Sequence, residues 1–144
     1  MEGIRKININ DTEYPKLLKE IPDPPETLYV KGKLIFDESC FGVVGTRRYS
    51  SYGKQVALEI TGDLAEAGLT IVSGLAPGID TFAHQATVER WKPARNASAT
   101  TSQMLADAGG GTIAVLGTGV DEKSIYPQSN VKLAKKIIET GGCL

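Results

Sequence analysis

The residues best suited to chemistry lie in one short stretch, 73–80, which reads Ser-Gly-Leu-Ala-Pro-Gly-Ile-Asp. Gly74 and Gly78 can adopt positive φ, so a ligand can approach the main-chain amides closely. A helix that begins directly afterwards presents unpaired N–H groups and a partial positive charge, which together favour a phosphate. The stretch therefore predicts an anion-binding turn that includes Ser73.

Asp80 ends this stretch, and two roles are open for it. As the N-cap of the following helix, its carboxylate would accept hydrogen bonds from backbone N–H groups. Alternatively, it accepts hydrogen bonds from a sugar or a base, because a carboxylate repels a phosphate placed on the same turn. In that case the phosphate lies against neighbouring loops.

The surrounding pattern predicts strands that alternate with helices, which is typical of a parallel sheet with right-handed crossovers. The run 41–45 is apolar and bounded by glycine, as expected of a strand buried on both faces. A short helix over 14–20 and an extended segment over 27–33 precede this part of the chain. The other expected elements are strands at 69–73 and 112–117, helices at 54–67, 80–90 and 131–140, and the start of a fourth strand at 141–144.

Small or polar residues follow three of these strands, and the carboxyl ends of parallel strands share one edge of a sheet. We therefore expect the stretches 45–47, 73–80 and 117–119 to converge on one crevice.

The Arg47 guanidinium can clamp a phosphate bidentately there, or it can be an ordinary solvated arginine. Tyr49 and Tyr52 can stack on bases, or they can cover the sheet as loop residues.

The overall charge limits where a polyanion could bind. The net charge is −1 and the pI is about 5.9, so a polyanion site has to be local. Two windows without acids, 39–58 and 90–106, are the candidates.

His84 is expected in the core or on a helix face. No dinucleotide fingerprint, P-loop, metal-ligand cluster or catalytic constellation can be assembled, so we expect no cofactor, no metal and no enzymatic activity.

With 144 residues, 41% of them hydrophobic, the chain is long enough for one soluble domain. We predict an N-terminal extension over 1–34 and a Rossmann-like domain over 35–144, with a long loop over 90–108. No signal peptide or membrane span is evident in the sequence, so a cytoplasmic protein is expected.

Several motifs taken together resemble the DNA-processing protein A (DprA/Smf) family. The resemblance covers nearly the whole chain in order. It is carried by 29–32 (Tyr-Val-Lys-Gly), 44–47 (Val-Gly-Thr-Arg), 51–53 (Ser-Tyr-Gly), 72–76 (Val-Ser-Gly-Leu-Ala), 78–80 (Gly-Ile-Asp), Ala83, His84, 112–117, Asp121, Tyr126, Pro127 and Asn130.

The resemblance implies an α/β, Rossmann-like three-layer sandwich with a mainly parallel sheet, of which this chain holds the front half after its short N-terminal segment. It also implies a protein that binds single-stranded DNA, protects incoming strands and helps to load a RecA-type recombinase in natural transformation, with homodimers in full-length members. The matching phosphate-binding positions are Gly45, Thr46, Arg47, Ser73, Gly74, Gly78 and Asp80.

This chain departs from the family pattern at Pro77, where many members carry a basic residue, and in the insertion at 90–108. Two other interpretations stay open. One is a nucleotide-binding sensor or nucleoside-monophosphate hydrolase on a related fold, although 110–112 (Gly-Gly-Thr) lacks the proline, extra glycine and acid of those hydrolases. The other is a divergent copy whose glycines serve folding alone.

Overall fold

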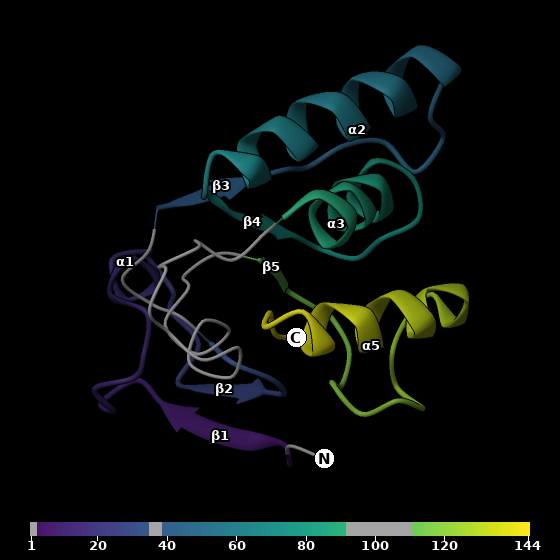
Figure 1. The fold of residues 1–144 in the computed structure, drawn as a ribbon. Helices are drawn as coiled ribbons and strands as arrows, with labels where there is room; N and C mark the ends of the chain where they lie inside the picture. The colour runs from purple at the N-terminus through teal and green to yellow at the C-terminus, as the bar shows by residue number, and fades with distance from the viewer. Residues whose placement is uncertain (1–2, 35–38, 92–110) are drawn as a thin grey trace, which may run out of the picture.

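The centre of the computed structural model, which describes residues 3–34, 39–91 and 111–144, is a parallel sheet with the strand order β3-β4-β5 (Figure 1). In the register, Phe41 is opposite Ile71, and Ile71 is opposite Thr112. The predicted α/β fold with parallel strands is confirmed. The strands are β3 (Cys40–Gly42), β4 (Thr70–Ser73) and β5 (Thr112–Ala114).

The helices that follow the three strands cover one face of this sheet. Because each strand lies beyond its predecessor in the same direction, right-handed crossovers place all the connecting helices on that face. Ile71 packs there with Ala65 and Ala83 of two helices, and Ala114 packs with Ile137 of the third. The helices are α2 (Ser51–Glu66), α3 (Ile79–Arg90) and α5 (Val131–Glu139), the last preceded by the 3-10 turn η1 (Gln128–Asn130).

Helix α2 begins earlier than the apolar spacing predicts. The Ser50 hydroxyl accepts a hydrogen bond from the Gly53 N–H at 3.0 Å, and this N-cap allows the helix to start at Ser51 rather than Lys54. Because β3 also ends earlier than expected, at Gly42, the loop between β3 and α2 keeps its expected length.

The N-terminal residues form a small unit next to β5, the last strand of the parallel sheet. Strands β1 (Arg5–Asn8) and β2 (Thr27–Val30) pair antiparallel, and α1 (Lys16–Lys19) lies between them in the chain. The Tyr14 hydroxyl donates to the Pro25 carbonyl at 2.7 Å. Ile7, Tyr14 and Val30 form a buried cluster with Cys143, and Ile113 of β5 packs against it.

Cys143 joins this unit to the parallel sheet. It forms a parallel bridge with Ile113 and an antiparallel bridge with Gly32. The Ala114 N–H donates to the Cys143 carbonyl at 2.9 Å, and the Leu144 N–H donates to the Lys31 carbonyl at 2.9 Å. The expected strand start at 141–144 is confirmed in this short form. The domain boundary at residue 34 stays a prediction.

The prediction of a strand at 41–45 buried on both faces is wrong. Phe41 is 44% exposed and Val44 is 90% exposed. Phe41 is exposed because β3 lies at the edge of the described sheet, where only β4 pairs with it and the helices cover only one face. Val44 is exposed because β3 ends at Gly42, so that Val44 lies in the loop that follows. An apolar run indicates strand formation, but it does not show how many neighbours the strand has.

No helix among the described residues has the length and apolar character needed to cross a bilayer. Nor do they include a group of three or more His, Cys, Asp or Glu side chains placed to hold a metal ion.

His84 is fully buried between α3 and the sheet, which is one of the two positions expected from the sequence. Its Nδ1 lies 2.7 Å from the Thr112 hydroxyl, which itself donates to the Ile71 carbonyl at 2.7 Å. Since the Thr112 proton is used in that bond, Nδ1 of His84 carries the ring proton. Nε2 is buried with no hydrogen-bond partner among the described residues.

Burial lowers the pKa of His84 from 6.5 to about 4, with a smaller opposing effect of the Ser73 backbone. The unfolded chain therefore binds a proton at a higher pH than the folded chain does, and stability falls as the pH drops below the unfolded value.

We predict that the free energy of unfolding decreases by about 2 kcal/mol between about pH 7 and about pH 5, from the shift of this one group. Urea unfolding followed by circular dichroism at both pH values measures it. Because His84 is the only histidine in the chain, His84→Gln should flatten the curve in this window. An unchanged slope in that variant would assign the pH dependence to carboxylates instead.

Candidate functional site

The loops that follow β3, β4 and β5 meet at one edge of the sheet, as their order requires. The Ile79 N–H donates to the Thr46 carbonyl at 3.2 Å, which joins the first loop to the second. The Val115 N–H donates to the Ser73 carbonyl at 2.8 Å, which joins the second to the third. The stretches 45–47 and 73–80 are therefore in direct contact, and the end of β5 lies beside the second of them. That 117–119 belongs to the same surface stays a prediction.

Gly78 permits the closest approach between these loops. Its φ is +91°, and a Cβ at this position would overlap the Thr46 carbonyl oxygen and stand 3.0 Å from the Arg47 carbonyl oxygen. Gly45 is restricted in a similar way, since a Cβ there would lie 2.5 Å from the Ile79 side chain. Both glycines are required by contact between loops, whether or not a ligand is bound.

Asp80 is not the N-cap of the following helix, which is the first of the two roles expected from the sequence. Gly78 is the N-cap of α3, so Asp80 falls in the first turn of the helix, and its side chain points back into the loop. The carboxylate Oδ2 accepts a hydrogen bond from the Gly74 N–H at 3.1 Å, and the residue is only 7% exposed. The Gly74 amide, expected to face a phosphate, is therefore bonded within the protein.

Ser73 and Thr46 also use their hydroxyl groups inside the protein. The buried Ser73 Oγ donates to the Val43 carbonyl at 2.8 Å and fixes the end of β3. Thr46 Oγ1 accepts from the Arg48 N–H at 3.0 Å and donates to the Arg48 carbonyl at 3.2 Å, which closes a tight turn. These side chains shape the loops and do not offer free donors.

Asn130 supports the second loop, a role that its sequence context does not indicate. Its Nδ2 donates to the Leu75 carbonyl at 3.0 Å and to the Thr81 hydroxyl at 2.8 Å. Thr81 in turn donates to the Ala76 carbonyl at 2.7 Å. These bonds hold Leu75 at φ +57°, a left-handed conformation that is unfavourable for a branched residue. Only the fold could bring Asn130 this close.

The groups left for a ligand lie mainly in the loop after β3. Gly45, Thr46 and Arg47 are exposed, and the N–H groups of Gly45 and Arg47 donate no hydrogen bond to the described residues. The Arg47 and Arg48 side chains likewise have no acidic partner within 4.0 Å in the described part of the chain. The loop combines free amides with uncompensated positive charge.

The two tyrosines of this region differ in their surroundings. Tyr52 is 77% exposed at the start of α2. Tyr49 is 47% exposed and makes an edge-to-face contact with Phe82, with ring centroids 4.6 Å apart. Tyr52 therefore has free ring faces for stacking, and Tyr49 is partly engaged in packing.

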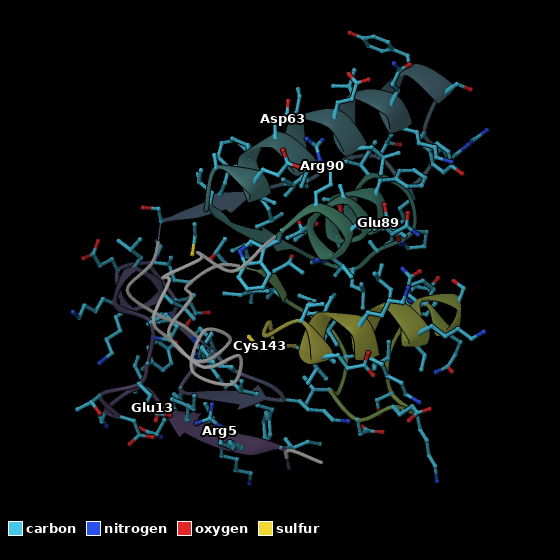
Figure 2. The ribbon with its side chains drawn as sticks, in the orientation of Figure 1. Arg5, Glu13, Asp63, Glu89, Arg90 and Cys143 are labelled. Carbon is cyan, nitrogen blue, oxygen red and sulfur yellow. The ribbon has the colours of Figure 1, made fainter. Side chains whose placement is uncertain are left out.

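The second window without acids contains an arginine that is already neutralised. Arg90 is the last residue of α3, and its side chain reaches α2 (Figure 2). Its Nη2 lies 2.6 Å from the Asp63 carboxylate and 3.0 Å from that of Glu66. Hydrogen bonds to Glu66 and Asp63 raise the pKa of Arg90. The predicted insertion at 90–108 lies, apart from Arg90 and Trp91, outside the described residues, as do the other basic residues of this window.

Comparison with known proteins identifies relatives along most of the chain. The sequence model of the family described as DNA recombination-mediator protein A matches residues 5–144. Protein Smf of Synechocystis is 39% identical over 137 residues, and DNA processing protein DprA of Bacillus subtilis is 38% identical over 135 residues. The matches cover 92% of this chain in both cases, but 29% and 39% of those relatives.

Solved structures agree with the sequence comparison. DNA processing protein A from Streptococcus pneumoniae has a TM-score of 0.71 and 32% identity, over 97% of this chain and 42% of that one. The protein from Helicobacter pylori, whose structure was described for its single-stranded DNA binding mode, has a TM-score of 0.70 and 26% identity, over 99% and 56%. The chain thus spans about half or less of the length of these proteins.

The packing of Gly78 leads to a prediction about stability. Gly78→Ala should lower the free energy of unfolding by more than about 2 kcal/mol, because alanine adds both backbone strain and overlap with the loop after β3. Gly117→Ala is the matched control, since a Cβ at Gly117 meets nothing within 4 Å, and it should change stability by less than about 0.5 kcal/mol. Equal urea midpoints for the two variants would contradict the close approach.

Proposed function

The chain belongs to the DNA recombination-mediator protein A family, and we propose that it binds single-stranded DNA along the edge where the three loops meet. The observation that carries the proposal is the exposed loop after β3, in which Arg47 and Arg48 have no acidic partner among the described residues. The proposal is also supported by the single-stranded DNA binding described for the Helicobacter pylori relative.

The proposed contacts separate into direct and supporting ones. The amides of Gly45 and Arg47, together with the Arg47 guanidinium, bind backbone phosphates, for which planar guanidinium groups and free N–H groups are suited. Tyr52 stacks on a base, and Tyr49 contributes the exposed part of its ring. The supporting residues, which hold the loops in position, are Thr46, Ser73, Gly74, Gly78 and Asp80.

The remaining parts of the proposal concern the complete protein. The bound strand is protected and handed to a RecA-type recombinase, which fits the family description as a recombination mediator. We further propose that full-length relatives act as homodimers and that the protein works in the cytoplasm. Binding is the primary activity in this scheme, and no catalytic step is needed.

Replacing Arg47 tests the DNA site. Arg47→Ala should weaken the binding of oligothymidine about 5- to 10-fold and lower the slope of log affinity against log salt by about 0.7, the value for one phosphate contact on a single strand. Fluorescence anisotropy of a labelled oligonucleotide at several salt concentrations measures both. The loss should be the same for every base sequence, because phosphates carry no sequence information.

Arg5→Ala is the matched control for this experiment. Arg5 is a surface arginine of β1 that is paired with Glu13 at 3.0 Å, and it lies on the N-terminal unit away from the three loops (Figure 2). Its replacement should leave affinity unchanged. Equal losses in the two variants would indicate diffuse attraction without a site.

A separate assay tests the hydrolase interpretation. Release of free base from a nucleoside monophosphate would support it.

A further inference from the structure

We propose that Phe82 is a positioning residue of the DNA site, which holds the loop after β3 and Lys54 in place without neutralising their positive charge. The inference rests on the proposed function, because it assigns Phe82 a part in the same site. Phe82 lies on α3, one turn after Gly78, and is 8% exposed.

The Phe82 ring contacts the loop after β3 through Tyr49. The two rings are 4.6 Å apart between centroids and meet at 89°, the edge-to-face geometry that aromatic pairs favour. The loop is thus attached to α3 at two points. Thr46 is bound through its carbonyl to the Ile79 N–H, and Tyr49 is bound through its ring to Phe82. Arg47 and Arg48 lie between these two attachments in the chain.

The same ring also holds a cation. Nζ of Lys54, in the first turns of α2, lies 5.1 Å from the centroid of Phe82, within the range of a cation–π contact. The ring therefore brings Lys54 to the same part of the surface as Tyr49. Lys54 has no carboxylate within salt-bridge distance in the part of the chain that the structure describes.

An aromatic ring and a carboxylate can both hold a cationic side chain, but they differ in their effect on its charge. Asp63 and Glu66 hold Arg90 firmly, but their charges cancel its own. An aromatic ring attracts a cation through its quadrupole and carries no net charge, so the cation keeps its field. Phe82 thereby orders Lys54 on the ring that also holds Tyr49 of the loop, and it leaves the charge of Lys54 available to phosphates.

A comparison of Phe82→Leu with Phe82→Tyr tests this role, since leucine keeps apolar bulk and tyrosine keeps the ring. Phe82→Leu should weaken oligothymidine binding about 3- to 5-fold, the size of an exposed cation–π contact, and Phe82→Tyr should bind like the wild type.

Lys54→Met should cost less affinity in the Phe82→Leu background than in the wild type. The heteronuclear NOE of the 47–49 amides, measured without DNA, should fall in Phe82→Leu alone.

A second cation–π pair supplies the control. Lys6 Nζ lies 5.3 Å from the Tyr29 ring centroid in the N-terminal unit, so Tyr29→Leu removes an equivalent contact and should leave DNA affinity unchanged. If Phe82→Leu does not fold, Lys54→Met and Tyr49→Leu remove the partners instead of the ring and should each weaken binding.

Different results would overturn the role of Phe82 and the proposed DNA binding. A folded Phe82→Leu protein with wild-type affinity, or strict additivity with Lys54→Met, would overturn the role of Phe82 and leave the proposed function intact. A folded wild-type chain that does not bind oligothymidine at low salt would overturn the proposed function, and the role of Phe82 with it.

Discussion

The close contact between the turn at Gly78 and the carbonyl of Thr46 is the constraint on which the candidate site depends. It sets the distance between the loops after β3 and β4, and it fixes where α3 can begin. Since α3 starts at Ile79, Asp80 points back to the Gly74 amide and Phe82 faces the first loop. A side chain at residue 78 would displace all of these groups together.

The polar groups of the site are divided between the interior and the surface. Ser73, Asp80 and Asn130 each form hydrogen bonds within the loops, as buried polar groups must if they are not to lose stability. The amides and guanidinium groups of the first loop face solvent instead. Rigid loops held from inside can bind an anion without first losing much conformational entropy, which favours affinity.

The arrangement of charge explains how a chain of net charge −1 can offer a polyanion site. Acidic side chains neutralise Arg5, Arg90 and Lys135 through ion pairs on other parts of the surface. In the first turns of α2, the partner of Lys54 is an aromatic ring. Positive potential is therefore local, and it is not visible in the overall composition.

The sequence by itself determined the order of strands and helices, because apolar periodicity is a local property of the chain. It also predicted His84 in the core or on a helix face, and the structure has it in the core. The tertiary structure alone decided that Asp80 bonds the Gly74 amide and that Val44 is 90% exposed. The physical reason is that hydrophobic pattern and side-chain type show what a residue can do, whereas its partner depends on which distant segment the fold brings within a few ångströms.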